Sequence, residues 1–316
     1  MKGKLVVRVI ACIAAALLLV LIGGMGFVYL APETATHTFL AIERKQAGLE
    51  RKEIDLADGT HYVYLEGGTG EPLMLLHGFG ANKDSFVRAT RYLTNRYRVI
   101  VPDHIGFGES SHPQDADYSP IAQAERLHAL AKALGISNVH LGGNSMGGHI
   151  AMSYAALYPA EVKSLWLLDP GGIWTAPKSE LRQIIDETGQ NPLIVRNEED
   201  FAALLTMVMT KRPFIPKPII NVMAQERIKN YELEKRIFGQ ITSDSIEERI
   251  KGLATPSLIV WGDQDRLINV ATTEILHGLL PNSKVIIMQG IGHVPMVEMP
   301  QESADDYLRF RATLSN

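Results

Sequence analysis

One serine lies in a dense cluster of glycines. The stretch NVHLGGNSMGGHIAMSYAALYP, residues 138–159, places Ser145 between Gly143 and Gly147, after a short apolar run and before an alanine-rich helical pattern. In so tight a strand-to-helix turn, side chains at the two glycine positions would clash with backbone, and the serine hydroxyl would project from the end of the strand. The free N–H groups of the helix would stabilise a developing anion. The spacing therefore predicts a nucleophilic serine.

A serine hydroxyl becomes a good nucleophile when a histidine removes its proton and a carboxylate orients that histidine. If the partners follow in the order serine, acid, histidine, only His277 and His293 lie C-terminal to every plausible acid. His277 falls in the helical pattern TTEILHGLL, where a surface role is expected. His293 follows the apolar run KVIIMQ in a glycine-flanked loop. His293 is therefore the expected base.

The expected acid lies in VWGDQDRLINV, where a strand ends in two aspartates. Asp263 comes directly at the end of the strand, and Asp265 lies further into the turn, from which its carboxylate can reach sideways to the histidine loop. We therefore expect Asp265 to be the acid. Asp169, in LLDPGG, is an alternative, although a turn-capping role would also explain it.

Hydrolysis through a serine also needs two N–H donors for the tetrahedral intermediate. The backbone of Met146, directly after the serine, is one expected donor. The loop LLHGFGANKDSF supplies the other, with Phe79 as the donor, and His77 in that loop is expected to bond to backbone. The sequence contains no metal-binding or phosphate-cradling motif, so neither a metal nor a cofactor is expected.

These residues belong to an alternating series of strand-like and helix-like stretches that begins at Glu53. Such alternation predicts an α/β fold with a mostly parallel central sheet flanked by helices. The expected core comprises residues 54–172 and 255–316. Between them, residues 173–254 are helical in pattern and contain the proline-rich RPFIPKP. We expect this insert to form a helical cap over the C-terminal edge of the sheet, where such sheets bind ligands.

One segment of the cap, FAALLTMVM at residues 201–209, is too apolar for an exposed helix. It can form the cap's own core. Alternatively, Phe201, Leu204, Leu205 and Met209 can line an acyl-binding tunnel or touch a bilayer.

The N-terminus predicts a membrane anchor. Residues 1–8 are basic, and residues 9–30 form 22 residues without a charge, enough to span a bilayer. A cleaved signal peptide is the alternative, but its apolar core would be shorter and followed by an A-x-A-like site. Basic residues before the span favour a non-cytoplasmic catalytic domain, in the periplasm of a bacterium. Residues 31–53 would be a linker and lead-in.

Bulk composition limits the remaining possibilities. The 316 residues carry a net charge of −4, so nucleic-acid binding is not expected. Cys12 is the only cysteine, which excludes an intramolecular disulfide. Nothing in the sequence specifies an oligomeric state.

Four motifs occur in the order typical of the α/β-hydrolase family: HGFG at 77–80, GNSMGG at 143–148, WGDQD at 261–265 and GH at 292–293. The sequence therefore resembles that family, and the resemblance covers most of the expected core. Together with the anchor, DPGGIW and GHxxxxExP, the four motifs are similar to the membrane-anchored monoacylglycerol lipase branch and its bacterial lipase relatives. This resemblance implies Asp265 as the acid, Phe79 and Met146 as oxyanion donors, and a cap that lines an acyl pocket.

The leading hypothesis is a serine esterase or lipase that acts on monoacylglycerols or medium-chain carboxylic esters through an acyl-enzyme. A hydrolase of carbon–carbon bonds in ring-cleavage products would use the same triad. A catalytically silent, membrane-anchored binding module is a third possibility, but such proteins usually lose a triad residue. Dehalogenases and epoxide hydrolases would place an aspartate where Ser145 stands.

Overall fold

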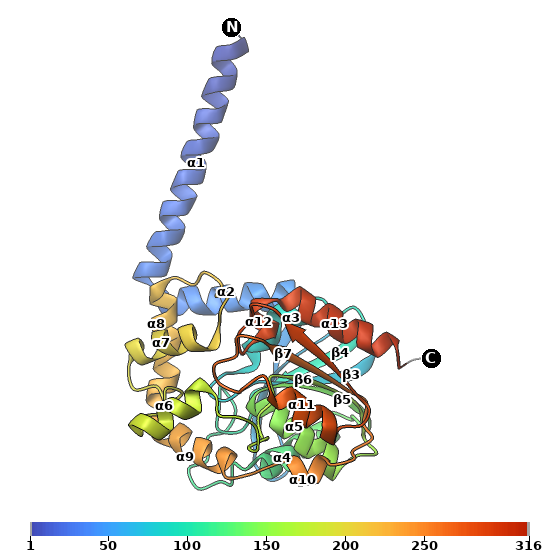
Figure 1. The fold of residues 1–316 in the computed structure, drawn as a ribbon. Coiled ribbons are helices and arrows are strands. Elements are labelled where there is room, and N and C mark those ends of the chain that lie inside the picture. The colour runs from blue at the N-terminus through green and yellow to red at the C-terminus, as the bar shows by residue number, and fades with distance from the viewer. Residues whose placement is uncertain (1, 315–316) are drawn as a thin grey trace.

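A twisted eight-stranded sheet runs through the body of the molecule (Figure 1). This computed structural model describes residues 2–314. The strand order is β1-β2-β4-β3-β5-β6-β7-β8; β1, β2 and β4 pair antiparallel, and every later pair is parallel. The strands are β1 (Leu49–Asp55), β2 (His61–Gly67), β3 (Glu71–Leu76), β4 (Tyr97–Pro102), β5 (Val139–Asn144), β6 (Val162–Leu168), β7 (Ser257–Gly262) and β8 (Ser283–Met288). The expected mostly parallel α/β fold is confirmed.

Helices cover both faces of this sheet, and successive strand residues alternate between them. Leu165 and Leu167 of β6 pack on the face of α4 (Pro120–Ala133), α5 (Met146–Leu157) and α11 (Thr272–Leu279). Trp166 and Leu168 pack on the face of α3 (Val87–Thr90), α12 (Pro295–Glu298) and α13 (Pro300–Ala312). Tyr307 of α13 stacks on Trp166, with ring centroids 4.9 Å apart. Because both faces are buried, the central strands read as apolar runs.

Local sequence explains where α4 begins. The Ser119 hydroxyl caps α4 by accepting from the Ala122 N–H, and Pro120 occupies the first turn. After β3 the chain forms only a 3₁₀ turn (Lys83–Phe86) and the short helix α3. The Thr90 hydroxyl donates to the Val87 carbonyl, and the N–H groups of Tyr92 and Leu93 bond three residues back, as in a 3₁₀ turn, where α3 ends.

Residues between β6 and β7 form further helices. The helices α6 (Glu180–Thr188), α7 (Glu198–Val208), α8 (Lys217–Lys229) and α9 (Tyr231–Thr242) lie beside the carboxyl ends of the strands (Figure 1), whereas α10 (Glu247–Ile250) packs on α5 and α11. Phe201 and Leu204 of α7 are buried against Val195 and Ala224, and Leu205 borders the same cluster. The apolar segment 201–209 therefore supplies much of the cap's own core.

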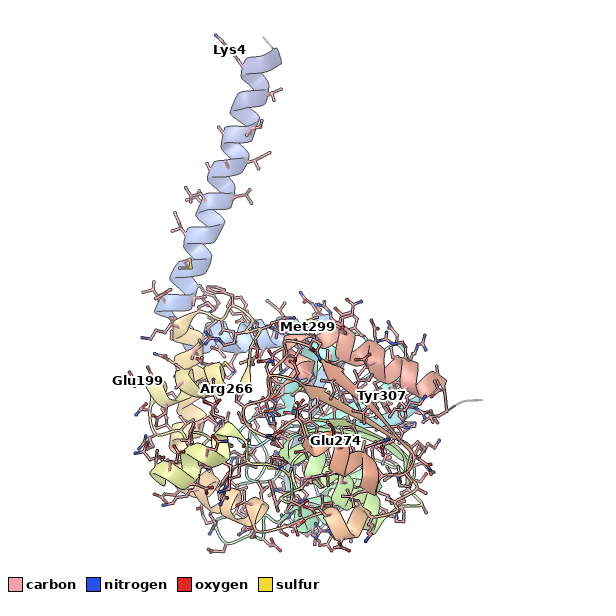
Figure 2. The ribbon with its side chains drawn as sticks, viewed as in Figure 1. Lys4, Glu199, Arg266, Glu274, Met299 and Tyr307 are labelled. Carbon is pink, nitrogen blue, oxygen red and sulfur yellow. The ribbon has the colours of Figure 1, made fainter. Side chains whose placement is uncertain are left out.

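The N-terminal helix α1 (Lys2–Leu30) stands away from the body, and its labelled Lys4 lies far from every other labelled side chain (Figure 2). Its stretch Ile10–Leu30 has a mean hydropathy of 2.6, so it is long and apolar enough to cross a membrane. Residues 31–53, expected as a linker and lead-in, hold α2 (Pro32–Gln46) and most of β1. Helix α2 turns sharply from α1 and packs on cap helix α8 (Figure 1).

Candidate active site

Ser145 occupies the turn between β5 and α5, with a backbone φ of 55° and ψ of −117°. A positive φ is uncommon outside glycine and marks a strained position. A Cβ atom at Gly143 would lie 2.3 Å from the Gly147 carbonyl oxygen, and one at Gly147 would lie 2.1 Å from the Leu76 carbonyl oxygen. Both positions therefore require glycine, which is the steric demand that the sequence spacing predicted.

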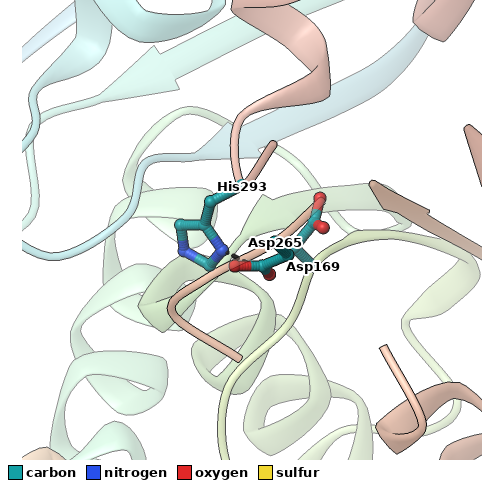
Figure 3. A group of neighbouring side chains, drawn as sticks. All are labelled: Asp169, Asp265 and His293. Carbon is teal, nitrogen blue, oxygen red and sulfur yellow. Dashed lines mark hydrogen bonds and ion pairs between the residues drawn. The ribbon is translucent and has the colours of Figure 1, made fainter. Parts of the chain in front are cut away.

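His293 and Asp265 form a buried hydrogen-bonded pair (Figure 3). The His293 Nδ1 lies 2.7 Å from the Asp265 Oδ2, and their side chains are 4% and 0% exposed. The other oxygen, Oδ1, accepts from the N–H groups of Leu267 and Ile268 at 2.7 and 3.1 Å. These bonds fix the carboxylate, which orients the His293 ring with Nδ1 facing Asp265 and Nε2 on the opposite side of the ring.

The neighbouring candidates make other contacts. Asp263 is half-buried, and its Oδ1 accepts from the Gly290 N–H at 2.7 Å, which closes the turn after β8. His277 is exposed on α11 and bonds to the Ser283 hydroxyl. The structure therefore brings His293 to Asp265 and leaves Asp263 and His277 elsewhere.

Asp169, at the end of β6, lies beside this pair (Figure 3). It is completely buried, and its Oδ1 accepts from the Gly262 N–H at 2.9 Å. Ligand atoms of Asp169, Asp265 and His293 all lie within 4.8 Å of one another. Burial, and then the charge of Asp265, raise the pKa of the Asp169 carboxyl well above its usual range. A neutral Asp169 can donate a hydrogen bond towards Asp265.

The loop after β3 passes directly over the serine. A Cβ atom at Gly78 would lie 3.3 Å from the Ser145 Cβ, so the backbone of this loop faces Ser145 at close range. His77 Nδ1 lies 2.8 Å from the Gly78 carbonyl oxygen, and Nε2 accepts from the His104 N–H at 3.0 Å. His77 is therefore bonded to backbone on both sides, and burial lowers its pKa. Met146 begins α5, where helical N–H groups lack intrahelical acceptors.

Sequence reasoning missed a cap residue that holds this loop. The Arg227 guanidinium of α8 lies 5.6 Å from the centre of the Phe79 ring, within cation–π range. Its Nε donates to Glu234 at 2.6 Å in a buried ion pair, and its Nη2 donates to the Leu193 carbonyl. No local pattern distinguishes Arg227 from the other cap arginines, so only the fold reveals it.

Two further residues position the histidine loop. The Asn144 side chain donates to the carbonyl oxygens of Leu168 and His293, at 3.0 and 2.9 Å. The buried Glu298 accepts from the Gly292 N–H with one oxygen and from the Thr210 and Lys211 N–H groups with the other. Asn144 precedes the serine, and Glu298 belongs to the GHxxxxExP motif. These positions in or beside the motifs were the signal from which the sequence could have indicated a positioning role for both residues.

Comparison with known proteins identifies the family. A family model described as the alpha/beta hydrolase fold matches residues 71–208, which include the Ser145 turn. The chain is 46% identical to "Lipase 1" of Psychrobacter immobilis, over 96% of this chain and 97% of that protein. It is 28% identical to "Monoacylglycerol lipase ABHD6" of Mus musculus, over 77% and 76%.

Solved structures agree. The chain resembles a structure titled "membrane phospholipase A, a novel bacterial virulence factor", with a TM-score of 0.88, 40% identity, and coverage of 97% of this chain and 99% of that one. The similarity in sequence and in structure thus extends over nearly the whole length of this chain. This chain therefore belongs to the α/β-hydrolase family, with bacterial lipases among its relatives.

Proposed function

We propose that this ester hydrolase cleaves monoacylglycerols and medium-chain carboxylic esters through an acyl-enzyme on Ser145, while α1 anchors it in a membrane. The observation that carries the proposal is the buried His293–Asp265 hydrogen bond of 2.7 Å, on a loop that Asn144 ties directly to the serine turn. This arrangement supplies a nucleophile, a base and an orienting carboxylate, as acyl transfer requires.

Each residue has a defined step. The Ser145 oxygen attacks the ester carbonyl carbon while His293 Nε2 takes the hydroxyl proton, and Asp265 stabilises the resulting imidazolium. The N–H groups of Met146 and Phe79 bind the oxyanion of the tetrahedral intermediate. His293 then gives its proton to the leaving alcohol oxygen, which breaks the ester bond. Water attacks the acyl-enzyme by the same route and releases the carboxylic acid.

The choice of substrate follows from the relatives and from the anchor. The relatives named above are lipases, and α1 would hold the catalytic domain beside membrane lipids. Each buried methylene contributes about 0.8 kcal/mol of transfer free energy, so kcat/KM should rise over the first carbons of the acyl chain. The basic residues before the span favour a catalytic domain on the non-cytoplasmic side.

A set of three variants tests the proposed site. Ser145→Ala should abolish both fluorophosphonate labelling and ester hydrolysis, because the covalent intermediate cannot form. Asp265→Asn should lower kcat by about 10⁴-fold through a misoriented imidazole. Asp263→Asn is the matched control, since its carboxylate bonds to the Gly290 N–H rather than to His293, and it should retain most activity.

The assay should use the native protein and the variants on an ester series from acetyl to long-chain monoacylglycerols. Strong labelling of Ser145→Ala, or a greater loss in Asp263→Asn than in Asp265→Asn, would contradict the site. A native enzyme that prefers acetyl esters throughout would contradict the lipid substrate.

A further inference from the structure

The loop between α7 and α8, residues 209–216, exposes a large aromatic side chain. Phe214 is 92% exposed, although phenylalanine normally loses most of its surface on folding. It lies in the proline-rich stretch RPFIPKP, and the exposed basic residues Lys211, Arg212 and Lys217 flank it. An aromatic tip with basic neighbours is typical of a surface that contacts lipid headgroups and the adjoining acyl region.

The packing of this loop shows which turn of α1 it contacts. Ile215 packs in a cluster with the buried Val28, Ala35 and Ile219, and Val28 belongs to the last turn of the apolar span. About 20 residues at 1.5 Å rise cross a hydrocarbon core, so a span that begins at Ile10 ends near Tyr29. The loop therefore contacts α1 at the level where that helix leaves the bilayer.

Other side chains at this level fit the same boundary. Tyr29 and Leu30 are 59% and 89% exposed, and an aromatic ring at the end of a span is typical of a membrane interface. Beyond its base, α1 projects side chains into open space, with no other part of the protein around them (Figure 2). In Figure 1, the yellow chain between α7 and α8 rises beside the base of α1.

The same loop is bonded to the histidine loop at its other end. The Val208 carbonyl accepts from the His293 N–H at 2.8 Å. The Thr210 and Lys211 N–H groups donate to Glu298, whose other oxygen accepts from the Gly292 N–H. The start of the loop is thus bonded directly to His293 through Val208, and to the neighbouring Gly292 through the Glu298 carboxylate.

We propose that residues 209–216 form a membrane-contact loop, in which Phe214 inserts into the interfacial region of the phospholipid bilayer that holds α1. This inference rests on the proposed anchoring. The inserted loop holds the cap at the bilayer surface, and Glu298 links that position to the histidine loop. Lipid esters can then reach the cap side of the site without crossing bulk water, so the loop raises the rate on membrane-embedded esters and leaves soluble esters unaffected.

The insertion can be measured in the full-length protein because Cys12 is the only cysteine. In a Cys12→Ser background, Phe214→Cys would carry an environment-sensitive fluorophore, and Glu187→Cys on α6 would be the exposed control away from α1. Both proteins are reconstituted into phospholipid vesicles with nitroxide-labelled lipids. We expect blue-shifted emission and lipid quenching at position 214 alone, independent of the protein-to-lipid ratio.

Two results would overturn the insertion. One is equal quenching of both positions by aqueous iodide with none by lipid nitroxides. The other is protection at position 214 that disappears on dilution in lipid, which would mean that a second copy of the chain covers the loop.

The kinetic arm compares Phe214→Ser with the conservative Phe214→Trp. Cleavage of monoacylglycerol in vesicles should fall several-fold in the serine variant and recover in the tryptophan variant, while hydrolysis of a soluble short-chain ester stays unchanged in both. Equal losses on both substrates, or no loss on vesicles, would contradict the role of the loop. Because the fluorescence arm needs no activity, an error in the proposed substrate is distinguishable from an error in the proposed contact.

Discussion

At the scale of single residues, Asp169 shows how burial changes the pKa of a carboxyl group. Its carboxyl has no exposure, and the Gly262 N–H is its backbone donor. Asp265 and Glu298 are the acidic groups that raise its pKa further after burial, and His293 completes the cluster. A neutral Asp169 beside a charged Asp265 would concentrate the negative charge on the one carboxylate that contacts the histidine.

This assignment predicts a pH-dependent stability difference. The folded protein keeps a proton on Asp169 that the unfolded chain releases near pH 4, so this group makes folding less favourable as pH rises towards its raised pKa. Asp169→Asn removes the titration and keeps an oxygen for the Gly262 N–H. The melting temperature of the variant should therefore improve relative to the native protein between pH 5 and 8, measured by thermal unfolding.

Asp263→Asn is the matched control for that measurement, since Asp263 is half-buried and bonds to the Gly290 N–H. A difference between Asp169→Asn and the native protein that is the same at every pH would show that Asp169 does not hold the extra proton.

At the scale of elements, the cap and the core are joined by buried polar groups as well as by apolar packing. Arg227 of α8 pairs with Glu234 of α9 and covers Phe79 in the loop after β3. A Cβ atom at Gly80 would lie 2.1 Å from the guanidinium carbon, so the backbone and the arginine pack with no space between them. The position of the proposed oxyanion donor thus depends on a cap helix.

Removing one partner of this pair should be costly. Arg227→Met leaves Glu234 buried without its cation, which should lower the free energy of unfolding by about 3–5 kcal/mol. The double variant Arg227→Met with Glu234→Leu should recover much of that stability, because no lone charge stays buried. Its kcat should still fall several-fold, since the Phe79 ring loses its contact with the guanidinium.

Denaturant unfolding and ester kinetics on the same preparations check this. Arg196→Met is the control, because the Arg196 side chain is 55% exposed in its pair with Asp200, so its removal should change the free energy of unfolding little. A double variant with native kcat would show that Arg227 serves the cap alone.

At the scale of the whole molecule, the base of α1, α2 and the cap form one packed unit. Val28 of α1 is buried with Ala35 of α2 and with Ile215 and Ile219 of the cap. Helix α1 therefore joins the body of the protein at Val28, although the apolar sequence continues to Leu30.

Two truncations test this boundary. Removal of residues 1–26 should release a folded soluble hydrolase that keeps Val28. Removal of residues 1–30 should give a less stable protein, because losing a buried valine costs about 1.5–3 kcal/mol. Thermal unfolding of both proteins measures the difference, and equal melting temperatures would mean that the last turn of α1 does not stabilise the cap.

The sequence by itself determined the features that depend on local sterics and on periodicity. Gly143 and Gly147 indicate a turn in which only glycine fits, and Ser119 with Pro120 is a typical start for a helix such as α4. The alternation of elements indicated the parallel sheet, and the uncharged run indicated the long apolar helix. These features need only residues close together in the chain, so the sequence carries their signal directly.

Only the tertiary structure decided which distant groups meet. The sequence favoured Asp265 over Asp263 as the partner of His293, but the contact itself depends on how two loops after different strands are oriented. The contacts of Arg227 with Phe79, and of Glu298 with the cap, join residues that no short pattern relates. The exposure of Phe214 likewise follows from packing, because hydropathy alone makes phenylalanine a core residue. Such contacts arise when loop ends come together in space, and local propensity does not specify that geometry.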